Sequence, residues 1–258
     1  MLVQTIPLFQ DAHLLRRGML EALSDYTFLF QEYMYKGYGD GILAGCELTA
    51  TEDVIILGQG VLLFENRPYL LKEPMMAAYH PTNNLTVLKL MFFDEMRDPN
   101  YIYREMELIF SEQTHMRKGE MELCRFTLQE GARLRYQYRD FEDRDTIYDT
   151  MNRVHVPYAS LGGSTLSPEI TRSFAAEMLE LSSITDYDAL FCTQILGQNH
   201  PLGPEALRAY LRRKGTEEFI GETNHELYMG LADILRKARG EHRPQETERR
   251  KKWRVTVE

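Results

Sequence analysis

The sequence predicts an α+β protein: an N-terminal helix, a mostly antiparallel β domain of sandwich or barrel-like form, and then a C-terminal helical domain. The apolar spacing changes from a helical period to a β pattern near Gly41 and returns to a helical period near Ser167. Glycines and a proline-containing turn also divide residues 40–71 into short runs, as turns between strands do. The predicted divisions are a helical segment (1–40), an antiparallel β domain (41–137), a transition segment (138–165), an α-helical domain (166–240) and a basic tail (241–258).

The first predicted element is helical and covers residues 11–35. Asp11 is suited to cap it, and a second helical piece begins near Asp25. Three glycines in residues 36–41 then favour a turn. We expect the rest of the chain to cover only half of this helix, which leaves an apolar stripe for a partner. The stripe residues expected to contact that partner are Leu15, Met19, Leu23 and Tyr33.

Short strands joined by tight turns are predicted in the β domain. Residues 101–111 and 121–128 alternate in polarity on either side of a turn at 116–120. We therefore expect these two segments to pair as an antiparallel hairpin. The strands predicted before this hairpin are residues 54–57, 60–64, 69–71 and 85–93.

Four helices are predicted after the transition segment, because residues that cap or open a helix precede each apolar stripe. The fourth has the clearest start, since Thr223 and Glu226 are spaced as a capping box. Gly215 and Gly240 are suited to end the third and fourth helices. The other starts are Ser167 with Pro168, Asp186 and Pro204.

Composition excludes several classes of protein. With 43% hydrophobic and 27% charged residues, the chain can form a globular core. Its net charge of −9 disfavours a nucleic-acid partner, although residues 241–258 are basic. We see no signal peptide and no apolar run near the roughly 20 residues that span a bilayer, so we expect no membrane partner and synthesis in the cytoplasm. The three separated cysteines, Cys46, Cys124 and Cys192, are expected to be buried free thiols.

No group of residues points clearly to catalysis, so we expect no catalytic residue, no cofactor and no metal. The chain lacks a phosphate-binding loop of the Walker type and the paired Cys or His spacings of zinc sites. An acidic cluster at residues 140–145 is best explained as a solvated turn with Arg139 and Arg144 as partners. The carboxylates that a hydrolase could use are Glu105, Glu107, Asp140 and Asp143.

Tyrosines are frequent at the edges of the predicted domains. Tyrosine is favoured at protein interfaces because it combines a large apolar area with a polar tip. Tyr101 and Tyr103 are therefore added to the expected partner interface. Together with Tyr138 they could instead line a groove for a carbohydrate or a receptor.

Two segments carry a resemblance to a known family. The strand DGILAGCEL and the following IILGQGVLLFENRPYLL, behind an amphipathic helix, resemble structural proteins of contractile phage tails and phage-tail-like particles of the Firmicute prophage type. The segments TLQEGARLRYQYRDF and SPEITRSFAAEML are similar to the same group. The order of elements is similar, more loosely, to the type VI secretion baseplate adaptor. One departure is Asn66 and Arg67 at a hairpin tip where glycine is more usual, which leaves the turn type open.

The resemblance implies a non-enzymatic structural or adaptor component of a phage tail-like assembly, at the baseplate or a fibre attachment. Such a component would act through protein interfaces with other tail or baseplate proteins, form a homo-oligomer and belong to a virion or tail-like particle. Two alternatives stay open: a carbohydrate- or receptor-binding module that uses aromatic strand faces, and a carboxylate-based hydrolase.

Overall fold

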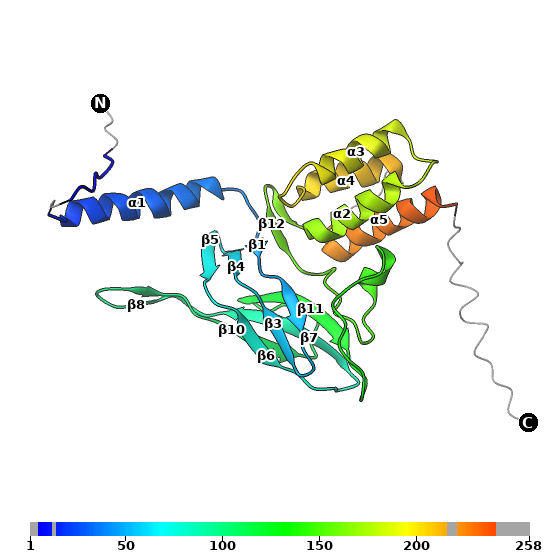
Figure 1. The fold of residues 1–258 in the computed structure, drawn as a ribbon, viewed down its shortest axis with the longest axis horizontal. Helices are drawn as coiled ribbons and strands as arrows, with labels where there is room; N and C mark the ends of the chain where they lie inside the picture. Colours follow the sequence, from blue (N-terminus) through cyan, green and yellow to red (C-terminus); the bar gives the residue numbers. More distant parts are fainter. Residues whose placement is uncertain (1–4, 12–13, 216–220, 241–258) are drawn as a thin grey trace, which may run out of the picture.

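The computed structural model describes residues 5–11, 14–215 and 221–240. It contains an N-terminal helix, a mostly antiparallel β region and C-terminal helices, which confirms the predicted α+β class. Figure 1 shows the first helix extending away from the β region on one side, with the other helices packed together on the opposite side. The predicted basic tail, 241–258, lies outside the described residues. The helices are α1 (Arg17–Met34), the short 3-10 helix η1 (Glu142–Asp145), α2 (Pro168–Leu179), α3 (Asp186–Leu196), α4 (Pro204–Lys214) and α5 (Asn224–Ala238).

Within the described ranges, the strands form four sheets. Their orders are β13-β12-β1-β4-β5, β10-β7-β11, β2-β3-β6 and β8-β9. The strands are β1 (Gly41–Gly45), β2 (Leu48–Ala50), β3 (Val54–Leu57), β4 (Gly60–Phe64), β5 (Arg67–Leu71), β6 (Met75–Ala78), β7 (Leu85–Phe92), β8 (Met96–Arg97), β9 (Ile102–Tyr103), β10 (Met106–Ser111), β11 (Glu120–Thr127), β12 (Tyr158–Ser160) and β13 (Gly163–Thr165).

Helix α1 differs from the expectation in two ways. It begins at Arg17 and not at Asp11, and Arg16 at its N-cap makes no side-chain cap. It also runs through Asp25 without a break. The reason is that the apolar residues on both sides of Asp25 keep one helical spacing, so the aspartate lies on the exposed polar side of a single helix.

The expected pairing of segments 101–111 and 121–128 as a hairpin is wrong. Strands β10 and β11 lie on opposite sides of β7 and both pair with it in antiparallel fashion, so that Leu108 and Met121 each face Leu90. β7 is apolar along most of its length and nearly all of it is buried. A strand with two buried faces belongs at the centre of a sheet, and the strands of alternating polarity take its edges.

Two features of the backbone shape the segment that begins at Asp40: a close approach of strands at Gly60 and a tight turn at Glu65 and Asn66. A Cβ atom on Gly60 would lie 2.5 Å from the carbonyl oxygen of Ala44, so only glycine allows β1 and β4 to approach as they do. The turn between β4 and β5 has φ angles of 48° at Glu65 and 59° at Asn66. Positive φ at both central residues is the type I′ geometry that suits a two-residue hairpin, which settles the open turn type. The expected tip at Asn66 and Arg67 is wrong by one residue, because Arg67 already pairs with Phe64.

Strands β12 and β13 come from the segment that the sequence places as a transition. β12 pairs in parallel with β1, where Tyr158 faces Ile42, and β13 completes that edge of the sheet. The polar residues before these strands connect the β region to the helices. The transition segment is therefore part of the folded structure.

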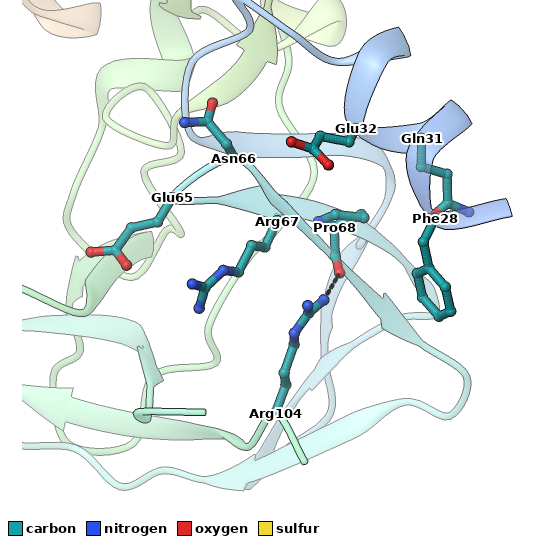
Figure 2. Close-up of a pocket in the computed structure, with 8 residues that line it drawn as sticks. All are labelled: Phe28, Gln31, Glu32, Glu65, Asn66, Arg67, Pro68 and Arg104. Carbon is teal, nitrogen blue, oxygen red and sulfur yellow. Dashed lines mark hydrogen bonds between the residues drawn. The ribbon is translucent and has the colours of Figure 1, made fainter. Parts of the chain in front are cut away.

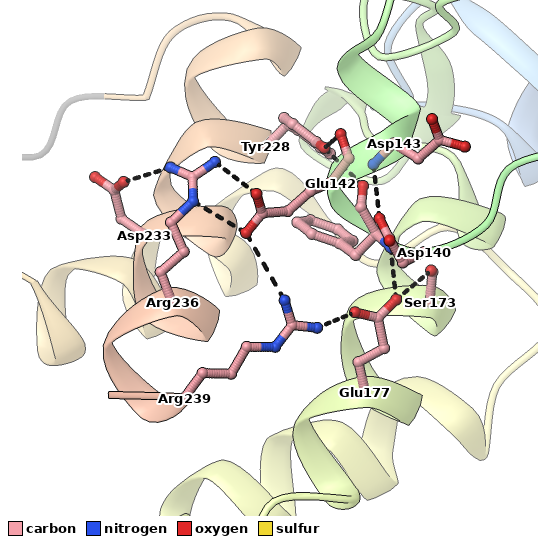
Figure 3. Close-up of polar contacts among 10 residues, drawn as sticks. Asp140, Glu142, Asp143, Ser173, Glu177, Tyr228, Asp233, Arg236 and Arg239 are labelled. Atoms are coloured by element: carbon pink, nitrogen blue, oxygen red, sulfur yellow. Dashed lines mark hydrogen bonds and ion pairs between the residues drawn. The ribbon is translucent and has the colours of Figure 1, made fainter. Parts of the chain in front are cut away.

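The acidic cluster before β12 is not a solvated turn beside Arg139 and Arg144. Glu142 binds arginines that are distant in the sequence, and Figure 3 shows it between the guanidinium groups of Arg236 in α5 and of Arg239 just after α5. Arg236 donates to Glu142 at 3.0 Å, and Arg239 lies 3.8 Å from the same carboxylate. Asp143 binds Arg135 through both oxygens. These ion pairs join η1 to α5 and to the segment after β11.

Two apolar cores hold the fold together. The first lies among the strands and includes Leu62, Leu88 and Phe126. The second lies among α2–α5 and includes Phe174 and Tyr210. The three cysteines are free and buried, as predicted.

Candidate interaction surface

Helix α1 contributes nothing to either core, since none of its 18 residues is buried. The expectation that it is half covered is therefore wrong, because both of its faces are open. Tyr33 is 70% exposed and Phe28 is 64% exposed, values that are unusual for aromatic side chains in a folded protein. Most of the stability of a helix in a protein comes from packing of its apolar face, so the uncovered apolar face of α1 is a candidate interaction surface.

Most apolar side chains of α1 gather on one side, whereas Phe28 lies on the other side beside Glu32. At about 3.6 residues per turn, they cover roughly half of the helix circumference. Tyr26 and Phe30 stack there with ring centroids 5.7 Å apart. Glu21, Asp25 and Glu32 lie on the other side, which makes the polar face acidic. The residues of the apolar side are Met19, Leu20, Ala22, Leu23, Tyr26, Leu29, Phe30, Tyr33 and Met34.

The β8–β9 hairpin is a second projection with exposed apolar side chains. Tyr101 is 66% exposed and Ile102 is 55% exposed. The hairpin is held locally, because the carboxylate of Asp98 accepts hydrogen bonds from the Tyr101 backbone and from the Tyr103 hydroxyl at 2.7 Å. That bond raises the pKa of Tyr103. The apolar side chains are thus presented on an ordered hairpin.

A groove lies between α1 and the β4–β5 turn. Figure 2 shows Phe28 and Glu32 of α1 on one wall, with Arg67 and Arg104 along the floor. Its volume is about 310 Å³. Arg104 donates to the carbonyl oxygen of Pro68 at 3.3 Å, which fixes the base of the hairpin against β5.

Three arginines surround one carboxylate at the base of the β8–β9 hairpin. Glu95 is 3.0 Å from Arg104, 2.6 Å from Arg97 and 3.8 Å from Arg67. Hydrogen bonds from Arg97 and Arg104 hold the pKa of Glu95 below its usual range. Three guanidinium groups share this single carboxylate, so Glu95 alone does not neutralise them.

The predicted interface residues fall on the two projections. Leu23 and Tyr33 are exposed on α1, and Met19 is partly exposed there. Leu15 is exposed but lies just before the helix, and Tyr101 and Tyr103 are exposed on the hairpin. That they contact a partner stays a prediction. The sequence reading missed the breadth of the apolar side, because it divided α1 into two pieces. One continuous helical projection would have added Leu20, Tyr26, Leu29, Phe30 and Met34.

The candidate carboxylates of a hydrolase lie on different elements. Glu105 is exposed just before β10, and Glu107 is exposed on β10. Asp143 is paired with Arg135, whose hydrogen bond lowers its pKa to about 2. Asp140 accepts a hydrogen bond from the backbone of Asp143 at 2.8 Å. Such a low pKa does not suit a general acid near neutral pH.

The three tyrosines of the aromatic-groove alternative are not gathered at one site. Tyr138 donates to the carbonyl oxygen of Met151 at 2.6 Å and lies under the guanidinium group of Arg144. Tyr101 and Tyr103 instead contact each other on the β8–β9 hairpin. Among the described residues, no group of three or more His, Cys, Asp or Glu side chains could hold a metal ion. No helix within those same residues combines the length and the apolarity needed to cross a membrane.

Fold and surface together define an α+β protein that presents apolar side chains on two projecting elements. Neither protein-family models nor curated proteins match the chain. Among solved structures, it is similar to a crystal structure of TssK, with a TM-score of 0.41 and 11% identity over 92% of this chain and 69% of that one.

Two further similar structures are assemblies. One is the type VI secretion system TssK-TssF-TssG baseplate subcomplex, with a TM-score of 0.42 and 10% identity over 91% of this chain and 98% of that one. The other is the baseplate complex from the type VI secretion system, with a TM-score of 0.44 and 10% identity over 92% of this chain and 99% of that one.

Proposed function

We propose that this protein is a non-enzymatic structural or adaptor component of a tail-like or baseplate assembly, and that it acts through protein–protein interfaces. Its partners are other baseplate or tail proteins and further copies of itself, and its place is in the assembled particle. The division into an N-terminal helix, a β domain and a helical domain serves this role, because each part can offer a separate surface.

The observation that carries the proposal is the uncovered amphipathic helix α1. Every apolar side chain on it is at least partly exposed, and several are large. Removing such a side chain from water contributes roughly 1.5–3 kcal/mol when burial is complete. A catalyst has no need of this surface, whereas a component that must bind neighbours does.

Self-association of the full chain, measured by sedimentation velocity, tests the proposal. We expect the wild type to associate and the variant Leu23→Glu with Phe30→Glu to be at least about tenfold weaker, because two carboxylates would enter an apolar contact. The thermal midpoint of the variant should stay close to that of the wild type, since neither residue is buried within one chain.

A matched pair of single substitutions places one charge on either side of α1. Leu23→Glu on the apolar side should weaken self-association, whereas Ser24→Glu, on the polar side and outside the groove, should leave it unchanged. A strictly monomeric wild type, or equal loss of association in both variants, would contradict the homo-oligomer and its use of α1.

A further inference from the structure

Helix α1 turns one side toward its own β region and the opposite side away from it. The residues of α1 that line the groove beside the β4–β5 turn are Phe28, Gln31 and Glu32 (Figure 2). At about 100° per residue, the middle of these three lies roughly 180° around the helix from the middle of the apolar side. The apolar side therefore faces away from the β4–β5 turn, and none of its residues is buried against the described chain.

The apolar side also has the spacing of a coiled-coil seam. Five of its residues follow one another at alternating intervals of four and three positions, which is the seven-residue repeat of helices that pack along a common axis. These five residues, which we call the seam, are Met19, Leu23, Tyr26, Phe30 and Tyr33. The residues directly beside the seam, its flanks, are Leu20, Ala22, Thr27, Leu29 and Met34. In a two-helix coiled coil the flanks are often charged, whereas all of these are uncharged and four are apolar.

We propose that the seam packs against the seams of other copies of this chain, in a parallel bundle of at least three α1 helices. The inference rests on the proposed function, because it specifies the surface and the arrangement through which the chain self-associates. The seams face the bundle axis and the groove side of each helix faces outward, so each β region lies outside the bundle. Copies related by a rotation axis along the bundle place their helices in parallel and at equal heights.

The breadth of the apolar side favours more than two helices. Helix α1 is about 27 Å long and about 10 Å wide, so half of its surface is on the order of 400 Å². A pair that buried all of this area on both helices would reach only about 800 Å² in total, which is the size of a crystal contact. Three helices would bury about 1,200 Å², which is within the range of specific interfaces. A pair would also leave the apolar flanks partly in water, whereas a third helix covers them.

The distribution of charge on α1 identifies the occupant as another copy. Charged flanks set partner choice in coiled coils, and no flank of this seam is charged. An uncharged apolar seam is complementary to itself. The acidic residues Glu21, Asp25 and Glu32 all lie on the outer side, where they stay in water in the bundle. An acidic polar face is also the opposite of what an anionic lipid surface attracts.

Disulfide formation between single cysteine variants of the full chain tests the parallel arrangement. In a parallel bundle the same seam position of neighbouring copies is close, so Met19→Cys and Tyr33→Cys should each form disulfide-linked dimers on mild oxidation. Ser24→Cys, on the outer side, is the matched control, and the three native cysteines are buried. We expect each seam variant to give at least about fivefold more linked dimer than the control on a non-reducing gel, because only the seam brings the Cα atoms close enough.

The number of helices is tested at the flanks. Leu20→Glu with Leu29→Glu places one charge on each side of the seam and leaves the seam itself unchanged. In a bundle of three or more helices both flanks are covered, so this variant should associate at least about tenfold more weakly than the wild type. Sedimentation equilibrium of the wild type should give the mass of at least three chains. A mass of two chains, or a flank variant that associates like the wild type, overturns the bundle.

The outcomes separate this inference from the proposed function. If neither seam variant links to itself but an equimolar mixture of Met19→Cys and Tyr33→Cys does, the helices are antiparallel and the bundle is overturned. If no combination links above the control, the seams do not meet and the bundle is likewise overturned. In both cases the proposed function stands as long as the wild type associates and Leu23→Glu with Phe30→Glu weakens that association. A strictly monomeric wild type overturns the bundle together with the homo-oligomer.

Discussion

Replacing Asp188 with alanine is expected to lower the free energy of unfolding of the α2–α5 helices by about 3–5 kcal/mol. Asp188 is 2% exposed and serves several donors. It accepts hydrogen bonds from the Tyr210 hydroxyl and the Lys214 ammonium group, both at 2.8 Å, and from the Thr185 hydroxyl at 2.6 Å. Alanine would leave the buried Tyr210 hydroxyl without this acceptor and remove half of a capping box.

The expected loss has a defined dependence on pH. Burial alone would raise the pKa of Asp188, but the hydrogen bonds from Lys214, Thr185 and Tyr210 outweigh it and lower the pKa to about 2, from an ordinary value of 3.8. A lowered folded-state pKa stabilises the protein above the unfolded-state value, and this contribution is lost as the pH falls. The difference between wild type and variant should therefore shrink by about 2 kcal/mol between pH 4 and pH 2.

Chemical denaturation followed by circular dichroism measures this difference at each pH. Asp186→Ala is the matched control, because Asp186 lies in the same first turn of α3 and is exposed. We expect the control to change the unfolding free energy by less than about 1 kcal/mol. A loss in the control equal to that of Asp188→Ala would show that the helix N-terminus, and not the buried contacts, sets the effect.

The second large loss of stability is expected when Lys89, a buried lysine in the central strand β7, is replaced. Its side chain is 1% exposed and lies 2.8 Å from Glu120, which is 5% exposed, and it donates to the carbonyl oxygen of His115 at 2.9 Å. Lys89→Met keeps most of the side-chain volume but leaves the Glu120 carboxylate buried without its cation. We expect a loss of about 3–5 kcal/mol in unfolding free energy.

A double substitution identifies the cause of that loss. Lys89→Met with Glu120→Gln removes both charges, so it should recover at least half of the stability lost in Lys89→Met. Lys118→Met, an exposed lysine in the adjacent loop, should have little effect. If the double variant is as unstable as Lys89→Met, the uncompensated carboxylate is not the reason and the packing of Lys89 is.

The elements that sequence reading placed best are those whose signals are local. Helix α5 begins after Thr223, and both halves of the predicted capping box with Glu226 are present. Helices α2 and α4 begin at Pro168 and Pro204, as their start signals predict. These signals work within one turn of helix, so no distant part of the chain can alter them.

Some residues of the candidate interface could also be identified from the sequence, because their patterns are local. The apolar spacing of Leu15, Met19 and Leu23 is visible in the sequence, and so is the alternation around Tyr101 and Tyr103. The sequence could not show that α1 projects away from the β region, or that the β8–β9 hairpin projects on the same side. Those facts depend on which surfaces the two cores already cover.

By itself, the sequence determined the α+β class, the order of N-terminal helix, β region and C-terminal helices, the starts of three of the C-terminal helices and the burial of the three cysteines. Each of these follows from periodicity, caps or composition. Only the tertiary structure decided that β7 lies between β10 and β11, that the acidic cluster at η1 binds Arg135 and Arg236, and that α1 has no buried residue. Strand pairing, ion pairs and exposure join residues that are far apart in the chain, and their energies depend on every other contact formed at the same time.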